Sequence, residues 1–176
     1  MSTGTVELLE TDRMVFERLR LEHAPDQLRL LLDARVAATL WPRREVPTER
    51  DVLEGLAAKI DHWERHGFGM WHLSDRATGE LIGRGGLQYT YTAGLHEVEA
   101  GWAIIPERWG QGLATELAHA CVEVGFDQLG LLQLVAFTLP DNVASRRVME
   151  KAGFEYERDI VHAGQPHVLY RRRPPA

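Results

Sequence analysis

The alternation of hydrophobic and polar residues along the chain predicts a domain that contains both strands and helices. Residues 14–19 alternate loosely, which is typical of a strand. A helix is expected from Pro25 to Leu32, because a proline in the first turn of a helix loses no hydrogen bond. The segment Thr48–Asp51 resembles a capping box, and the apolar residues that follow at helical spacing predict a second helix.

The middle of the chain is expected to hold three strands and a helix. The segment Asp75–Gly79 is rich in turn-forming residues, so its two flanks are predicted to form a hairpin. Pro106 ends the strand that follows, and apolar residues at helical spacing then indicate a helix that begins near Gly112. In chain order, these elements are strands at residues 70–73, 80–83 and 97–105 and a helix at about 112–126.

The last third of the chain predicts a strand, a helix and a final pair of strands. The apolar run 132–139 reads as a strand, and the helix 143–151 is expected to end at Gly153, a typical C-terminal cap. Two strands at 154–161 and 167–172 are separated by the turn-former Gly164. The whole order predicts one α/β or α+β domain, residues 1–176, with a mixed sheet.

Composition narrows the classes of function. The 176 residues include 20 Lys and Arg against 26 Asp and Glu, a net charge of −6, which argues against general binding to nucleic acid or to an anionic membrane. The single cysteine, Cys121, excludes an internal disulfide and a cysteine-cluster metal site. No signal peptide is recognisable, and the longest uncharged run, residues 128–140, is shorter than the ~20 residues that span a bilayer. We therefore expect a cytoplasmic protein, with a solvated basic tail at residues 171–176.

The most informative segment is the turn between the strand that ends at Ile105 and the helix that begins near Gly112. Its glycines, Gly110 and Gly112, allow successive main-chain N–H groups to point into one concavity. The N-terminus of the following helix adds unpaired N–H donors and a positive dipole, so the turn is a candidate pyrophosphate site. A Walker A sequence is absent, and a dinucleotide fingerprint would need a small residue where Thr115 stands.

At this point the sequence resembles the GNAT family of acyl-CoA-dependent N-acetyltransferases. Residues 109–114 are similar to the family loop Arg/Gln-x-x-Gly-x-Gly/Ala, except that Trp109 replaces the first Arg or Gln. Residues 106–116 resemble the RimJ/RimL branch, and the resemblance extends over about residues 8–171. Three further segments agree with that branch in order and spacing: residues 9–16, 79–83 and 142–154.

The resemblance implies a GNAT fold, with a mixed central sheet of six or seven strands flanked by about four helices. It also implies transfer of an acetyl group from acetyl-CoA to a primary amine, either the N-terminus of a protein or a small-molecule amine. A main-chain N–H near the end of the strand before the loop would bind the thioester carbonyl. The implied cofactor-binding residues are Ile104, Ile105, Trp109, Gly110, Gln111, Gly112, Leu113, Ala114, Thr115, Asn142 and Ser145.

Candidate catalytic residues follow from the needs of acetyl transfer to an amine. The amine must lose a proton, and a carboxylate within reach can accept it. Glu99 is the first candidate, and Glu97 is the second because alternation places both on one face of the strand. The alternative for each is a solvated strand residue. The family's sulfur-protonating tyrosine aligns with Met149, which cannot donate, so Ser145 is the candidate donor to the departing sulfur; the alternative is an ordinary residue of a helix N-terminus.

The cysteine and the histidines bear on whether the reaction uses an acyl-enzyme or a metal ion. Cys121 lies on the apolar stripe of its helix, which favours direct attack by the amine over an acyl-enzyme. His62 and His66 are four residues apart, as in a zinc site, but without a third ligand they are interpreted as a surface pair, and no metal is expected. Residues 39–47 and 89–96 are candidate substrate loops.

The expected partners are acetyl-CoA and an amine acceptor, without nucleic acid or membrane, and the protein is expected to be a monomer or homodimer. The acidic surplus suits the arrival of a cationic amine. A non-catalytic acyl-CoA-binding module of the same fold is the competing function, and it is favoured by Met149 and by the open choice of the base.

Overall fold

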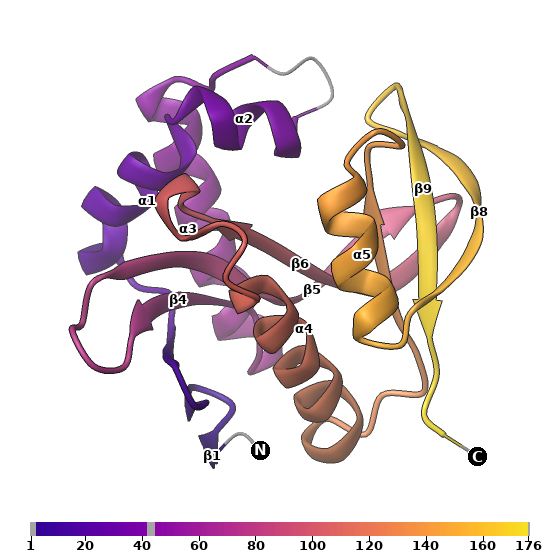
Figure 1. Ribbon diagram of the computed structural model, residues 1–176, viewed down its shortest axis with the longest axis horizontal. Coiled ribbons are helices and arrows are strands. Elements are labelled where there is room, and N and C mark those ends of the chain that lie inside the picture. The colour runs from indigo at the N-terminus through magenta and orange to yellow at the C-terminus, as the bar shows by residue number, and fades with distance from the viewer. Residues whose placement is uncertain (1–2, 42–44, 176) are drawn as a thin grey trace.

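A computed structural model describes residues 3–41 and 45–175, which form one mixed sheet flanked by helices (Figure 1). Nine strands are hydrogen-bonded in the order β1-β2-β3-β4-β5-β6-β7-β9-β8. Their bounds are β1 Thr3–Thr5, β2 Leu8–Glu10, β3 Met14–Arg18, β4 Met70–Asp75, β5 Leu81–Thr92, β6 Leu95–Ile104, β7 Leu134–Thr138, β8 Glu155–His162 and β9 Gln165–Arg172. All neighbouring pairs are antiparallel except β6 and β7, which are parallel.

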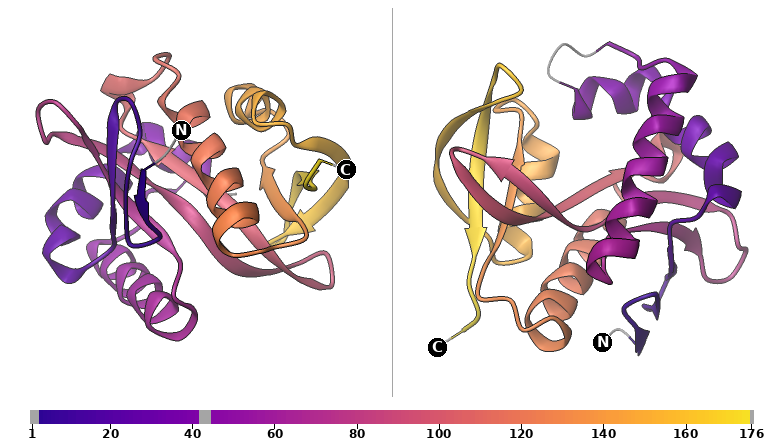
Figure 2. Two further views of the ribbon diagram at one scale, coloured as in Figure 1. Left: turned by 90° about the horizontal axis from the view of Figure 1, so that it is seen from below. Right: turned by 180° about the vertical axis from the view of Figure 1, so that it is seen from behind.

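Five α-helices are described: α1 Ala24–Leu31, α2 Ala34–Leu40, α3 Glu49–His66, α4 Leu113–Glu123 and α5 Val143–Lys151. Short 3₁₀ turns, η1 Leu21–His23 and η2 Pro106–Arg108, precede α1 and α4, and a π-helical turn, η3 Val124–Gln128, extends α4. Figures 1 and 2 show α1 and α3 against one face of the sheet and α4 and α5 against the other. None of the described helices is long and apolar enough to cross a membrane.

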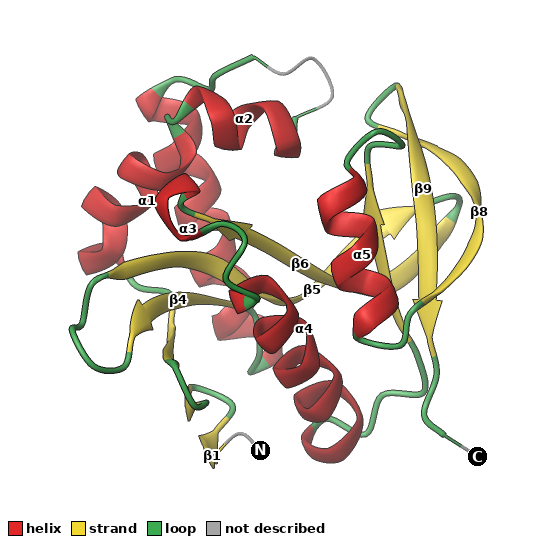
Figure 3. Ribbon diagram, viewed as in Figure 1, coloured by secondary structure: helices red, strands yellow, loops and turns green. Residues whose placement is uncertain are grey.

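The expected fold class is confirmed, although the sheet has more strands and the chain more helices than the six or seven strands and about four helices expected (Figure 3). The additions are the three-residue strands β1 and β2, which are too short to display a hydrophobic period, and α2. The N-cap of α2 is Asp33, whose carboxylate accepts a hydrogen bond from the Arg35 N–H at 2.8 Å.

The helix α3 is capped at both ends, and its N-terminal cap is the one that the sequence predicts. In α3, the Thr48 hydroxyl accepts from the Asp51 N–H and the Asp51 carboxylate accepts from the Thr48 N–H, which is a capping box. The helix ends at Gly67 with a φ of 71°, the left-handed conformation typical of a C-terminal glycine. These local signals fix where α3 starts and stops.

Two segments differ from their expected conformation. Most of the candidate loop 89–96 belongs to a long hairpin, because β5 continues to Thr92 and β6 begins at Leu95; Ala93 and Gly94, both with positive φ, form the tight turn. The candidate loop 39–47 includes residues 42–44, which lie outside the described residues, and it starts within α2.

The expected basic tail is only partly a tail. Arg171 and Arg172 belong to β9, and the Arg171 side chain is buried. Its guanidinium pairs with the carboxylates of Glu97, at 2.9 Å, and of Glu157. Arg171 therefore joins β9 to β6 and β8 instead of facing solvent.

Candidate active site

The central feature of the site is the separation of the two parallel strands. In the described part of the chain, β6 and β7 pair at a single position, Glu99 with Val135, and β6 then continues to Ile104 without β7 beside it. The Ile105 N–H donates to the Ile82 carbonyl of the β5 side at 2.9 Å. Because main-chain groups alternate along an antiparallel strand, the N–H of Ile104 is directed to the opposite side, where β7 has diverged.

This alternation corrects one of the two expected donors to the thioester carbonyl. The Ile105 N–H is already used by β5, whereas the Ile104 N–H faces the separated side of the strand. The Ile104 carbonyl faces that side too, and it accepts a hydrogen bond from the Trp109 indole Nε1 at 2.8 Å. Trp109, the residue that departs from the family loop, thus fastens the loop to the end of β6.

The glycine loop has the conformation that its sequence implies. Gly110 and Gly112 have φ values of 74° and 77°, which residues with a Cβ rarely adopt. Gly112 is the N-cap of α4 and no side chain caps the helix, whose first main-chain bond runs from the Glu116 N–H to the Gly112 carbonyl. The N–H groups of residues 113–115 thus have no acceptor within the helix, and they form a site for an anion together with the helix dipole.

Arg13 holds this loop in place. Its Nε donates to the Glu116 carboxylate at 2.7 Å, and its Nη1 donates to the Gln111 carbonyl at 2.6 Å. On the other side of the loop, Arg108 donates to the Gln111 side chain at 3.2 Å and to the Asp75 carboxylate at 2.6 Å. Both arginines are neutralised by carboxylates, so the positive field at the head of α4 comes mainly from main-chain groups.

Sequence reasoning missed the contact between Arg13 and Glu116. Both residues lie in segments that resemble the RimJ/RimL branch, but 103 residues separate them and neither segment indicates a partner. Only the folded structure shows that these two segments are neighbours.

The helix α5 borders the separated strands on the same face of the sheet as α4 (Figure 1). Asn142 is its N-cap and accepts from the Ser145 N–H at 3.2 Å, while its amide NH₂ is not used by this cap. Asn142 and Ser145 are half-buried. Met149, in contrast, is 1% exposed and packs in the core, so this position offers no donor to a ligand.

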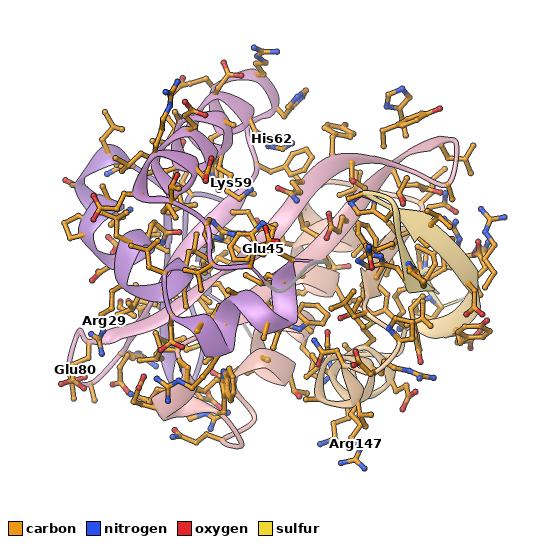
Figure 4. The ribbon with its side chains drawn as sticks, turned by 90° about the horizontal axis from the view of Figure 1, so that it is seen from above. Arg29, Glu45, Lys59, His62, Glu80 and Arg147 are labelled. Atoms are coloured by element: carbon orange, nitrogen blue, oxygen red, sulfur yellow. The ribbon has the colours of Figure 1, made fainter. Side chains whose placement is uncertain are left out.

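The two arginines of α5 have different surroundings. Arg146 donates to the Tyr170 hydroxyl and to the Pro140 carbonyl, both at 3.1 Å, and thereby joins α5 to β9. Arg147 is exposed, and its side chain points away from the body of the protein in Figure 4.

The two candidate bases have different surroundings. Glu97 is 7% exposed and its carboxylate accepts from Arg171 at 2.9 Å and from the Gln133 amide at 3.0 Å, so it is fully engaged. Glu99 is half-buried, and its carboxylate accepts a hydrogen bond of 3.1 Å from the Gln88 amide. Burial raises the pKa of Glu99, against the opposing influence of that hydrogen bond and of Lys59 and Arg84. A carboxylate with a raised pKa is a suitable proton acceptor.

Two cations that the sequence did not single out flank Glu99. Lys59 comes from α3 and donates to the Gln88 side chain at 3.4 Å, and Arg84 comes from β5 and donates to the Gln27 side chain of α1, also at 3.4 Å. We call Gln27, Lys59, Arg84, Gln88 and Glu99 the Glu99 cluster. Each is an isolated polar residue in its own segment, so no local motif signals the cluster.

The cysteine and the histidine pair have surroundings that suit a role in the structure of the protein. Cys121 is fully buried in the core, and burial raises the pKa of its thiol. His62 accepts from the Tyr89 N–H at 3.0 Å and its Nδ1 lies 2.9 Å from the Phe68 carbonyl, so both ring nitrogens are occupied. No group of three or more His, Cys, Asp or Glu side chains within residues 3–41 and 45–175 is arranged to hold a metal ion.

Comparison with known proteins agrees with this geometry. Residues 13–155 match the model of the acetyltransferase (GNAT) domain. YoaA of Bacillus subtilis, an uncharacterized N-acetyltransferase, is 30% identical over 152 residues, 85% of this chain and 84% of its own. Another curated relative, 32% identical over 108 residues, is matched over only 63% of its length.

Solved structures share the fold. An acetyltransferase from Agrobacterium tumefaciens superposes with a TM-score of 0.83 at 22% identity, over 98% of this chain and 97% of that chain. RimL, a ribosomal L7/L12 alpha-N-protein acetyltransferase in complex with coenzyme A, superposes with a TM-score of 0.75 at 18% identity, over 93% and 95% of the two chains. The diverging strands, the glycine loop at the head of α4 and the matched domain lead to one conclusion: the chain belongs to the GNAT acetyltransferase family.

Proposed function

We propose that the protein transfers an acetyl group from acetyl-CoA to a primary amine by direct attack, with Glu99 as the general base. The observation that carries this proposal is the position of Glu99 at the pairing of β6 with β7, on the strand that continues beyond this point without β7 beside it. Donors for an anionic ligand and an acceptor for a proton thus belong to one stretch of the fold.

The residues present fit an acyl-CoA substrate. The N–H groups of residues 110–115 and the dipole of α4 suit its pyrophosphate. The Asn142 amide, whose carbonyl oxygen is used by the cap of α5, has an NH₂ group to offer to the pantetheine arm. The Ile104 N–H is the donor for the thioester carbonyl, where negative charge develops during the reaction.

The chemistry proceeds from these positions. Acetyl-CoA supplies an activated acyl group as a thioester. Glu99 accepts the proton of the attacking ammonium, directly or through water, so that the neutral amine nitrogen can bond to the carbonyl carbon. Once bonded to the carbonyl carbon, the nitrogen is cationic, and it gives up a second proton as the carbon–sulfur bond breaks. This proton passes through solvent to the sulfur, so that coenzyme A leaves as the free thiol, and the Ser145 hydroxyl donates a hydrogen bond to the sulfur while negative charge develops on it. A free thiol has a pKa near 8.5, so a hydrogen bond suffices for this leaving group.

Direct attack is supported by the surroundings of the only cysteine. An acyl-enzyme would need a reactive thiolate, and Cys121 is enclosed in the core with a raised pKa. The acceptor is either a protein N-terminus, as the RimJ/RimL resemblance implies, or a small amine. The competing function is a non-catalytic acyl-CoA-binding module, which the buried Met149 in the position of the family's tyrosine favours.

The proposal is tested with purified protein, acetyl-CoA and a panel of amines that includes N-terminal peptides, amino acids and polyamines. Release of free thiol and mass spectrometry of each amine report acetyl transfer, and the Glu99→Gln variant serves as the matched control. Thiol release that depends on both the amine and Glu99 supports the enzyme. Tight binding of coenzyme A without thiol release for any amine supports the binding module instead.

A further inference from the structure

The Glu99 cluster contains more positive charge than its own residues neutralise. Among the described residues, no carboxylate lies within ion-pair distance of Lys59 or Arg84, in contrast to Arg13, Arg108 and Arg171. Each of the two cations makes one long hydrogen bond, 3.4 Å, to an amide oxygen. An Arg has five N–H donors and a Lys has three, so most donors of this pair are unused by the described protein.

The nitrogen of a buried side-chain amide beside Arg84 also lacks a hydrogen-bond partner among the described residues. Gln27 is 0% exposed, and its Nε2 has no hydrogen-bond partner among the described residues. Its Oε1 accepts from Arg84, which fixes the orientation of the amide and keeps the Nε2 donor next to the guanidinium. A buried donor without an acceptor costs free energy, and an anionic or carbonyl oxygen of a ligand would remove that cost.

The two cations of the cluster, Lys59 and Arg84, would be stabilised by a second negative charge beside Glu99. Burial and the repulsion from Arg84 lower the pKa of Lys59 to about 8, and burial lowers the pKa of Arg84 to about 10, while Glu99 opposes both shifts. One carboxylate therefore faces two cations, and when Glu99 takes up a proton during the reaction no negative charge remains in the cluster. An additional anion would stabilise both cations in their charged forms.

The strand residues of the cluster lie on one face of the sheet. Gln88 and Glu99 are direct partners in the β5–β6 pairing, and Arg84, four residues from Gln88, lies on the same face of the sheet, roughly 13 Å along the strand. That is the face covered by α1 and α3, opposite to α4 and α5. Figure 4 shows Lys59 on α3 with its side chain directed to the pink strands β5 and β6.

We propose that the acceptor is a small amine that also carries a carboxylate, such as an amino acid, with its amine at Glu99 and its carboxylate bound by Arg84, Lys59 and the Gln27 Nε2. Guanidinium and carboxylate match in geometry, and their hydrogen bonds are about twice as strong as neutral ones. This inference rests on the proposed function and names the substrate class of the same site. It also refines the expectation drawn from the net charge, because the surroundings of Glu99 are cationic although the chain is acidic.

The experiment compares matched acceptors. The standard L-amino acids are tested with acetyl-CoA, and each one that is acetylated is compared with its carboxamide and its decarboxylated amine. We expect kcat/KM for the amino acid to exceed that for its carboxamide by about tenfold or more, since a charge-assisted contact is lost. In Arg84→Met and in Lys59→Met this ratio is expected to fall toward one. Arg147→Met, an exposed arginine outside the cluster, is the control that keeps the ratio.

A second readout does not depend on turnover. With coenzyme A present, the preferred amino acid is expected to raise the melting temperature of the wild type and not that of Arg84→Met, while circular dichroism verifies that the variant is folded. If amines are acetylated but carboxamides react as well as the acids, or if Arg84→Met keeps the ratio, the inference is wrong. If no amine is acetylated at all, the proposed function itself fails.

Discussion

Glu97 and Glu99 lie two residues apart on one face of β6, yet the same substitution is expected to affect them in opposite ways. The Glu97 carboxylate and its partner Arg171 are each 7% exposed, and their contact measures 2.9 Å. Glu99 has no ion-pair partner among the described residues and a pKa raised by burial. Glu97→Gln therefore removes half of a buried ion pair, whereas Glu99→Gln removes a carboxylate that burial disfavours.

The magnitude for Glu97→Gln follows from the contacts. Arg171 keeps Glu157 as a partner and loses one hydrogen bond to a charged group, a loss of about 1.5–3 kcal/mol. For a domain of this size, 1 kcal/mol corresponds to roughly 2–4 °C, so the melting temperature should fall by about 3–12 °C. The dependence of kcat/KM on pH should stay as in the wild type, because the Glu97 carboxylate is already engaged by Arg171 and Gln133.

Glu99→Gln is not expected to lower the stability at neutral pH, in contrast to Glu97→Gln. Because the folded-state pKa of Glu99 lies above its unfolded value, the folded protein prefers the protonated carboxyl. Stability is therefore greatest below the unfolded pKa of about 4.3 and is lost as the pH rises through the folded pKa. A neutral glutamine avoids this loss, so at pH 7 the variant should melt no lower than the wild type. Its kcat/KM should drop by about 100-fold or more, with the rise toward high pH suppressed.

The assay combines thermal melts at pH 4 and pH 7 with initial rates across the pH range. At pH 4 both the wild type and Glu99→Gln carry a mostly neutral side chain at this position, so the advantage of the variant should shrink there. The reasoning is refuted if Glu99→Gln keeps the wild-type pH–rate profile, or if Glu97→Gln abolishes activity without a change in melting temperature.

Three further predictions concern the loop, the serine and the cysteine. Gly110→Ala should cost about 1–2 kcal/mol of backbone strain at its φ of 74° and raise the KM for acetyl-CoA; Gly130→Ala, with a φ of 64° and equally open surroundings, should cost similar stability without that rise, and equal KM values in both variants would contradict the loop's role. Ser145→Ala should lower kcat by about tenfold with KM for acetyl-CoA unaltered, because one hydrogen bond to the leaving thiolate is lost while the main-chain bond to Asn142 remains; an unchanged kcat would remove Ser145 from the mechanism. Cys121 should resist iodoacetamide in the folded protein and react after denaturation, as followed by mass spectrometry, and rapid alkylation of the native enzyme with loss of activity would contradict direct attack.

Local features of the chain were predictable from the sequence because their causes lie within a few residues. The caps at Thr48 and Asn142 need only a side chain and an N–H three residues later, and the capping box at Thr48 forms as predicted. The glycines of the α4 loop likewise permit a left-handed backbone, which both adopt. Prediction failed where periodicity was too short, as in β1 and β2, or where polar residues in a long hairpin resembled a loop, as at residues 89–96.

By itself, then, the sequence determined the order of strands and helices, the glycine loop at the head of α4 and, through resemblance, the family. The tertiary structure decided which side chains meet. Glu97 and Arg171 are 74 residues apart, and no local pattern indicates their contact. Lys59 and Glu99 come from a helix and a strand with no shared motif, so their electrostatic interaction is equally invisible in the sequence. Charge and burial depend on these long-range neighbours, and for that reason the different surroundings of Glu97 and Glu99, and the cations near Glu99, became visible only in the folded chain.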